Sequence, residues 1–167
     1  KTILVGLSGD DEDVCLEESG IDITYSNQYK RIFKNQMDWI NNLLEFIEID
    51  KNNLYIIRPH PRDWPDTQRS FVESDNYKNF KNYFKNKDLP KNLIINSPAD
   101  NVSVYDFMEI CDLLLVYRSS IAVDFGMMGI PVICSDLSLS LHPMYSDTLY
   151  ENKDEYFSLL KNKQLFN

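Results

Sequence analysis

A pair of serines after an apolar run is the feature of this sequence best suited to chemistry. Residues 113–117 are apolar without alternation, which is typical of a strand buried on both faces of a parallel sheet. Arg118, Ser119 and Ser120 interrupt the run, and the apolar residues of 121–128 predict a short helix. A helix that begins after a strand presents unpaired backbone N–H groups, which can hold a phosphate. The hydroxyls and Arg118 would add donors; the alternative is that one serine is only an N-cap.

A histidine held between two prolines is the second such feature. Residues 54–58 predict a strand, and the prolines flanking His60 restrict its backbone at the end of that strand. Ligands of open α/β sheets bind at the carboxyl ends of strands. Arg58 and Arg62 make this neighbourhood basic, which favours an anionic ligand. We therefore expect His60 to face a phosphate or a sugar, with a histidine satisfied in a turn as the alternative.

Two further turns follow predicted strands. Residues 2–7 predict a buried strand, and Ser8 and Gly9 follow it; the glycine permits close approach of a ligand, although the GxGxxG spacing is absent. Asp100 and Asn101 follow a strand expected near residues 93–96. The acidic residues 10–13 are interpreted as a solvated loop, with a metal site as the alternative.

The elements that must position these residues alternate along the chain. Helices are expected over residues 29–48, within 64–89, over 104–111, from 120 to 128 and over 152–162, and a fifth strand over 130–134. This alternation predicts an α/β, doubly wound (Rossmann-like) fold with a five-stranded parallel sheet in the order 3-2-1-4-5. The Ser8-Gly9, His60, Asp100 and Ser119-Ser120 turns would then lie at one end of the sheet, which favours the phosphate interpretation of the serines.

Length and charge limit the possible functions. The 167 residues fit a single domain, 1–167, and the formal charge of −9 argues against a nucleic-acid groove. Three cysteines without a CxxC pair fit buried thiols in a reducing compartment, and neither a membrane-spanning run nor a signal peptide is evident. The chain starts at Lys1 directly in a strand-like run, so we expect a domain excised from a longer protein. The cysteine pattern favours a cytoplasmic location.

Two blocks of sequence resemble the carboxyl-terminal, donor-binding half of a GT-B glycosyltransferase, most closely the capsule polysaccharide synthesis transferases and the CDP-glycerol glycerophosphotransferases. The first block is Arg-Pro-His-Pro at residues 58–61, and the second spans residues 112–132 with the serine pair and Gly-Ile-Pro-Val. The resemblance implies that His60, Ser119 and Ser120 contact the donor's phosphates, with His60 in the catalytic role. It also implies that the backbone near residues 96–101 meets the base.

Asp124 has two possible roles, and Arg118 departs from the family pattern. By the resemblance, Asp124 would reach a ribose hydroxyl or orient the serine turn; the alternative is a carboxylate that merely favours a helix N-terminus. Arg118 stands directly before the serines, where the glycerophosphotransferases usually have tyrosine, and Asp124 replaces the glutamate of many sugar transferases. These departures leave the donor open among CDP-, CMP- and UDP-linked compounds.

The resemblance implies a donor nucleotide-binding domain of a glycosyltransferase or polyol-phosphate transferase that makes a bacterial-type capsular or teichoic polysaccharide. Its partners would be a nucleotide-activated sugar or polyol and a missing amino-terminal acceptor domain, through which the inner face of the cell membrane could be reached. No cofactor beyond the donor and no metal are expected. The alternatives are an enzyme of the UDP-sugar 2-epimerase type and a non-enzymatic, receiver-like domain.

Overall fold

The computed structural model describes residues 1–9, 15, 18–19, 31–63, 73–85, 87–100, 102–135 and 150–161. Strands and helices alternate along this part of the chain, as the sequence predicts. The elements are β1 (Thr2–Gly6), α2 (Gln36–Ile49), β2 (Leu54–Arg58), α3 (Asp75–Phe84), β3 (Leu93–Ile95), the 3₁₀ helix η1 (Val104–Glu109), β4 (Leu113–Val116), α4 (Ile121–Met127), β5 (Val132–Cys134) and α5 (Lys153–Lys161).

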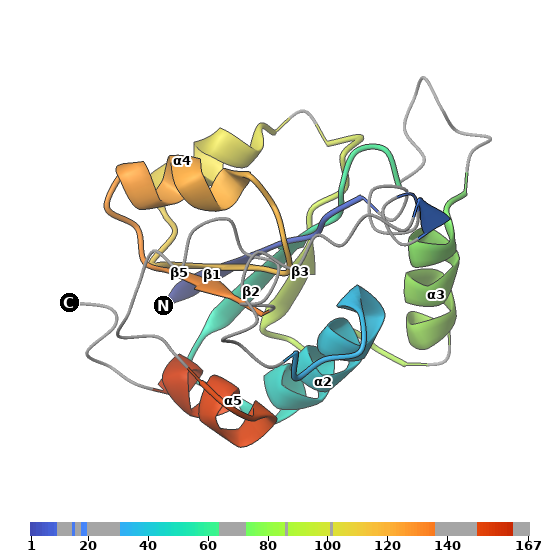
Figure 1. The fold of residues 1–167 in the computed structure, drawn as a ribbon, viewed down its shortest axis with the longest axis horizontal. Helices are drawn as coiled ribbons and strands as arrows, with labels where there is room; N and C mark the ends of the chain where they lie inside the picture. The colour runs from blue at the N-terminus through green and yellow to red at the C-terminus, as the bar shows by residue number, and fades with distance from the viewer. Residues whose placement is uncertain are drawn as a thin grey trace.

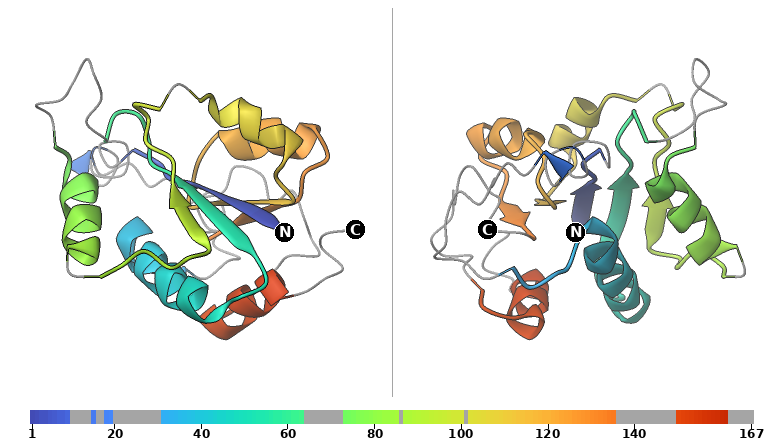
Figure 2. Two further views of the ribbon diagram at one scale, coloured as in Figure 1. Left: turned by 180° about the vertical axis from the view of Figure 1, so that it is seen from behind. Right: turned by 45° about the vertical axis from the view of Figure 1, so that its right-hand side comes forward.

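The five strands form one parallel sheet in the order β3-β2-β1-β4-β5, which confirms the predicted topology. Helices lie on both faces of this sheet: η1 and α4 on one, α2, α3 and α5 on the other (Figure 1). The views in Figure 2 show the same two outer layers. The order reverses between β1 and β4, so the topological switch point of the fold lies between these two strands.

The side chains of each strand alternate between the two faces of the sheet, and helices cover both faces. Each strand is therefore buried on both sides. Ile3 and Val5 of β1 join the larger core under α2, α3 and α5, whereas Leu4 joins the smaller core under η1 and α4. Two aromatic rings close the smaller core, Phe107 from η1 and Phe125 from α4. A continuous apolar run in this sequence therefore indicates a strand whose two faces both pack against a hydrophobic core.

Helix α2 begins later than the apolar spacing suggests. The prediction placed its start at residue 29, but residues 31–35 are not helical and α2 starts at Gln36. Asn35 is the N-cap, and its side-chain oxygen accepts a hydrogen bond from Asp38 N at 2.9 Å. The Asp38 carboxylate accepts from Lys34 N at 2.9 Å, so two hydrogen bonds that flank the N-cap fix the boundary. Ile32 and Phe33 have helical spacing but precede the helix.

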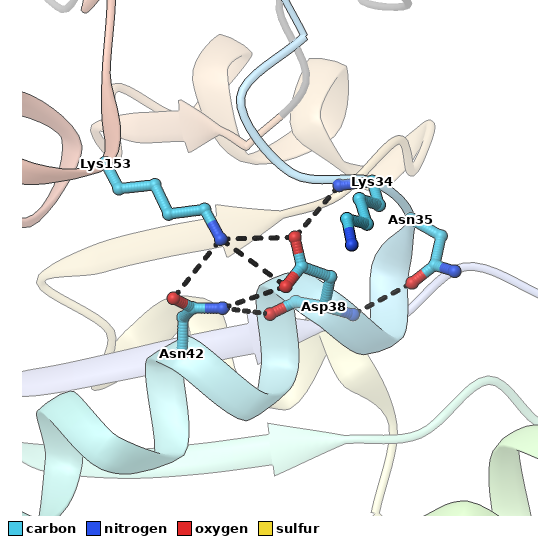
Figure 3. Close-up of polar contacts among 5 residues, drawn as sticks. All are labelled: Lys34, Asn35, Asp38, Asn42 and Lys153. Atoms are coloured by element: carbon cyan, nitrogen blue, oxygen red, sulfur yellow. Dashed lines mark hydrogen bonds and ion pairs between the residues drawn. The ribbon is translucent and has the colours of Figure 1, made fainter.

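Helix α5 is tied to α2 by a polar cluster around Asp38 (Figure 3). Lys153 at the start of α5 places its ammonium 3.2 Å from one Asp38 carboxylate oxygen and 3.3 Å from the Asn42 side-chain oxygen. The same ammonium lies 5.0 Å from the centre of the Phe33 ring, over its face. This cluster joins residues more than a hundred positions apart in the chain and holds α5 beside α2.

The cluster predicts a specific pH dependence. Burial raises the pKa of Asp38, but hydrogen bonds from Lys34 N and Lys153, the Lys153 charge and Asn42 outweigh it, so this pKa lies below its ordinary value. Because the pKa is lower when folded, the stabilisation exists above the unfolded value and is lost as pH falls through the folded value. In urea unfolding, wild type should exceed Asp38→Asn by about 0.5 to 1 kcal/mol at pH 7, and this difference should shrink below about pH 4.

The exposed Glu45 of the same helix supplies the control. Glu45→Gln should change the free energy of unfolding by less than about 0.5 kcal/mol at every pH, because substitutions of exposed residues without partners have small effects. A difference between wild type and Asp38→Asn that stays constant from pH 7 to pH 3 would contradict the assigned role of the carboxylate.

The remaining boundaries differ little from the prediction. The segment after Ser103 is a 3₁₀ helix instead of an α-helix, and Ser103 caps it through a reciprocal box with Asp106. Within the described parts of the chain, none of the helices combines the length and the apolar character needed to cross a membrane. Cys15 is exposed, and Cys111 and Cys134 are only partly buried, which differs from the prediction of buried thiols.

Candidate functional site

The candidate residues leave the sheet from one row of paired positions. Gly6 of β1 pairs with Arg58 of β2 on one side and with Val116 of β4 on the other. Ser8, His60 and Arg118 each come two residues after this row. Since neighbouring strands lie about 4.8 Å apart, the chains carrying the histidine and the serine pair leave the sheet about 10 Å apart, with β1 between them. The sheet therefore brings the predicted turns to a single end, here called the carboxyl end of the sheet.

Ser8 occupies the centre of this row and is almost completely buried. Its backbone N–H donates to the Gln36 side-chain oxygen at 2.7 Å, and its carbonyl accepts from the Gln36 amide nitrogen at 3.0 Å. The side chain is different: Ser8 is 3% exposed, and its hydroxyl has no hydrogen-bond partner among the residues that the structure describes. A buried hydroxyl without a partner costs about 1–3 kcal/mol, so this group is unusual in a folded protein.

In the turn after β2, one ring nitrogen of His60 already accepts a hydrogen bond. The Arg62 backbone N–H donates to His60 Nδ1 at 3.2 Å. In the neutral ring an accepting Nδ1 leaves the proton on Nε2, so Nε2–H is the donor that His60 can offer to a ligand. The ring is half-buried. This arrangement suits a hydrogen bond to a phosphate oxygen.

A buried contact with α3 fixes the histidine turn. Asp63 N donates to the His60 carbonyl at 3.0 Å, and the Asp63 carboxylate accepts from the Asn76 side chain at 2.9 Å. Asp63 is 5% exposed and Asn76 is 6% exposed. Ser74, the N-cap of α3, also donates its hydroxyl to the Asp63 carbonyl at 2.7 Å. Neither Asp63 nor Asn76 was predicted from the sequence, because one acid in a turn and one amide in a polar helix form no recognisable pattern.

Arg58 is turned toward the neighbouring strand. Its Nη1 donates to the Asn96 side-chain oxygen and, at 2.8 Å, to the Ser97 carbonyl. Burial lowers the pKa of the guanidinium, and the charge of Asp100 acts in the opposite direction. Arg58 was predicted to bind the ligand; the structure shows that its Nη1 holds the loop after β3. Asp100 lies in that loop and is exposed, whereas Asn101 lies outside the described residues.

The turn that carries Ser119 and Ser120, here called the serine turn, is followed by a helix that packs against Gly6 of the sheet. A Cβ on Gly6 would lie 2.6 Å from Ile121 Cδ1, so glycine at the end of β1 lets the first residue of α4 approach closely. Gly129 ends the α4 region with φ of +78°, as predicted for a C-terminal glycine. In this unit β4 pairs with β1, the first residue of α4 packs on Gly6, and β5 lies on the far side of β4.

The serine side chains do not cap α4. Ser120 is the N-cap but makes no side-chain cap hydrogen bond, and its backbone is already helical. Ala122 N and Val123 N donate to the carbonyls of Ser119 and Ser120, at 3.2 and 3.0 Å. No backbone acceptor is described for the N–H groups of residues 119–121. Ser119 is half-buried and Ser120 exposed, so their hydroxyls and these amides can be reached by a ligand.

Asp124 contacts Tyr105, a residue that was not predicted as part of the site. Tyr105 of η1 donates its hydroxyl to an Asp124 carboxylate oxygen at 2.9 Å. This hydrogen bond and the carboxylate charge raise the pKa of Tyr105. The pair links the two helical elements on one face of the sheet, and a bond between Asp124 and the serine turn is not among the contacts described. Contact with a ribose hydroxyl stays a prediction.

The arrangement offers hydrogen-bond donors for an anion. Nε2–H of His60, the Ser8 hydroxyl and the start of α4 all belong to the carboxyl end of the sheet, at or beside its switch point. The acidic run at residues 10–13 lies outside the described residues, and no group of three metal-binding side chains occurs among those that the structure does describe.

No family model, curated protein or solved structure matches this chain.

Proposed function

We propose that this chain is the donor nucleotide-binding domain of a glycosyltransferase or polyol-phosphate transferase that builds a bacterial-type surface polysaccharide. The observation that carries the proposal is the buried, unpartnered hydroxyl of Ser8 beside the switch point of the sheet. Such a group is explained if a ligand oxygen completes its hydrogen bonding. Phosphate oxygens fit, because unpaired backbone N–H groups at the start of α4 lie at the same end of the sheet.

The chemistry follows from charge development in the donor. When the bond between the sugar or polyol and its phosphate breaks, negative charge grows on the departing nucleotide. Donors aimed at that charge lower the barrier because they need no rearrangement at the moment of reaction. In this proposal His60 donates through Nε2–H, the Ser119-Ser120 turn holds the phosphates, and a separate acceptor domain supplies the general base. The domain by itself should bind nucleotide and turn over little.

The proposal is tested by a thermal-shift screen with CDP, CMP, UDP, GDP, ADP and dTDP. A ligand present at 100 times its dissociation constant adds about 2.7 kcal/mol to the stability of the folded state. We expect at least one of these nucleotides to raise the melting temperature. A folded sample that responds to none of them would contradict the proposal.

Ser8→Ala should separate binding from folding. Without ligand, this variant should be as stable as wild type or about 1 kcal/mol more stable, because it removes an unsatisfied buried hydroxyl. It should bind the best nucleotide about tenfold more weakly, since one hydrogen bond is lost. Urea unfolding and titration calorimetry measure the two effects.

Ser135 provides a matched control for Ser8. It is 1% exposed, and its hydroxyl donates to the Val116 carbonyl at 3.2 Å. Ser135→Ala should therefore lose about 1 kcal/mol of stability while nucleotide affinity stays near that of wild type. If Ser8→Ala loses stability as Ser135→Ala does and keeps full affinity, the Ser8 hydroxyl is structural and the proposal loses its main support.

A further inference from the structure

Large apolar side chains are exposed mainly on the layer formed by η1 and α4. In the part of the chain that the structure describes, such side chains belong to Ile49, Leu89 and Ile94, which are scattered, and to Val102, Tyr105, Ile110, Met127 and Met128, which lie in or beside η1 and α4. The most exposed of this second group are Met127 at 81%, Met128 at 68% and Ile110 at 57%. Single exposed apolar residues are ordinary, but a group of them on one layer marks an interaction surface.

Ile110 and the two methionines lie at one end of the sheet. Ile110 follows η1 and leads into β4, and Met128 follows α4 and leads into β5. These strands begin side by side, since Leu114 N donates to the Pro131 carbonyl at 2.9 Å. Figures 1 and 2 both show η1 beside α4. Ile110, Met127 and Met128, here called the methionine patch, therefore lie at the amino end of the sheet, opposite the end from which the predicted site residues emerge.

The methionine patch is bordered by acidic residues. The exposed Glu109 precedes Ile110, and the partly exposed Asp112 follows it two residues later. Residues 102–135 contain the carboxylates of Asp106, Glu109, Asp112 and Asp124 but a single basic residue, Arg118, which leaves the sheet at the opposite end. The lysines of the described helices belong to α3 and α5 in the other layer. This surface is therefore apolar with a negatively charged border.

The charge of the border selects among the possible occupants. Two copies of the chain meeting symmetrically through the methionine patch would bring Glu109 and Asp112 against like charges. An anionic membrane surface would be repelled in the same way. A helix with apolar residues on one side and lysine or arginine beside them fits both features, because it covers the methionines and pairs with the carboxylates. Methionine side chains also adapt their shape to the residues that they contact.

We propose that the methionine patch docks a basic amphipathic helix of another protein. Apolar residues spaced at i, i+3, i+4 and i+7 on that helix cover Ile110, Met127 and Met128. Glu109 and Asp112 attract its cations, which speeds association and fixes the orientation of the helix. The inference does not depend on the proposed nucleotide site, because the patch shares no residue with that site.

The test uses a synthetic helical peptide of about 18 residues with leucine on one face and lysine on the other, and a control peptide in which glutamate replaces lysine. In titration calorimetry with the full 167-residue chain, the lysine peptide should bind about tenfold more tightly than the glutamate peptide. Met127→Lys combined with Met128→Lys should weaken binding of the lysine peptide about tenfold, because it replaces apolar contacts by like charges.

Ile49 and Leu89 supply the matched control. Both are exposed apolar residues outside η1 and α4, 71% and 43% exposed. Ile49→Lys combined with Leu89→Lys adds the same charge as the methionine double variant, and it should change the affinity for the lysine peptide by less than about twofold. Equal affinity of the two double variants would overturn the inference, because the peptide would then respond to net charge alone.

Methyl resonances of labelled methionine locate the contact. Those of Met127 and Met128 should shift when the lysine peptide is added, whereas that of Met37 in α2 should not. Shifts at Met37 alone would overturn the inference. So would dimerisation of the wild-type chain in sedimentation, or its binding to vesicles of phosphatidylglycerol and phosphatidylcholine, if Met127→Lys combined with Met128→Lys abolished it; the occupant would then be a second copy or a lipid surface.

Discussion

His60→Ala should weaken binding of the best nucleotide roughly ten- to a hundredfold, because a hydrogen bond from a neutral side chain to a charged phosphate is worth about 1.5–3 kcal/mol. The expected donor is Nε2–H, since His60 Nδ1 already accepts from Arg62 N at 3.2 Å. The far-UV spectrum should not change, because the turn is also held through Asp63 and Asn76. Titration calorimetry with the nucleotide selected in the screen measures the loss.

Two conservative variants test which ring nitrogen acts. His60→Gln can place an amide N–H near the position of Nε2, whereas the shorter side chain of His60→Asn reaches only the position of Nδ1. We expect His60→Gln to keep part of the affinity and His60→Asn to behave as His60→Ala does. Wild-type affinity in His60→Ala would remove the histidine from the site, and equal affinity of the two amide variants would contradict the assigned tautomer.

Trp39→Ala should destabilise the fold by about 3–5 kcal/mol, the range for removing a large aromatic side chain from a packed core. Trp39 is 0% exposed, and its ring lies 6.0 Å from that of Tyr117 in a stacked arrangement. Its indole N–H donates to the Tyr156 hydroxyl at 2.9 Å, and Tyr156 is also 0% exposed. This contact joins α2 to α5 beneath the strand that leads to the serine turn. Urea unfolding measures the change.

Milder variants keep this prediction testable if Trp39→Ala does not fold. Trp39→Phe retains a ring but leaves the Tyr156 hydroxyl unpaired, which costs about 1–3 kcal/mol beyond the lost volume. Trp39→Phe combined with Tyr156→Phe removes both polar groups, so its loss should be smaller than the sum of the two single losses. Ile49→Ala, 71% exposed in the same helix, should change stability by less than about 0.5 kcal/mol. Strict additivity of the ring variants would contradict the buried hydrogen bond.

The local sequence pattern was sufficient to predict the sheet. The apolar run of β2 predicted its bounds, Leu54–Arg58, and the alternation of strand and helix predicted the order of all five strands. Gly129 ends α4 at positive φ because glycine has no Cβ to clash there. These features depend on neighbouring residues and on general rules of chain connection, which act on any sequence with this pattern.

The start of α2 shows where periodicity fails. Ile32 and Phe33 have helical spacing, and Phe33 is buried, but the Asn35 and Asp38 pair begins the helix at Gln36. Periodicity reports which residues face a core, and a buried residue before a helix gives the same signal as one inside it. The capping pair was present in the sequence and would have corrected the boundary.

The sequence by itself determined the chain's order of elements, the parallel sheet and the end of that sheet at which Ser8, His60 and the Ser119-Ser120 turn emerge. Only the tertiary structure decided what each side chain does there: Arg58 holds the loop after β3, Asp124 pairs with Tyr105, and the Ser8 hydroxyl stays unpaired. The reason is physical. Strand order follows from local periodicity and short connections, whereas a hydrogen bond depends on atoms from distant segments meeting within about 3 Å.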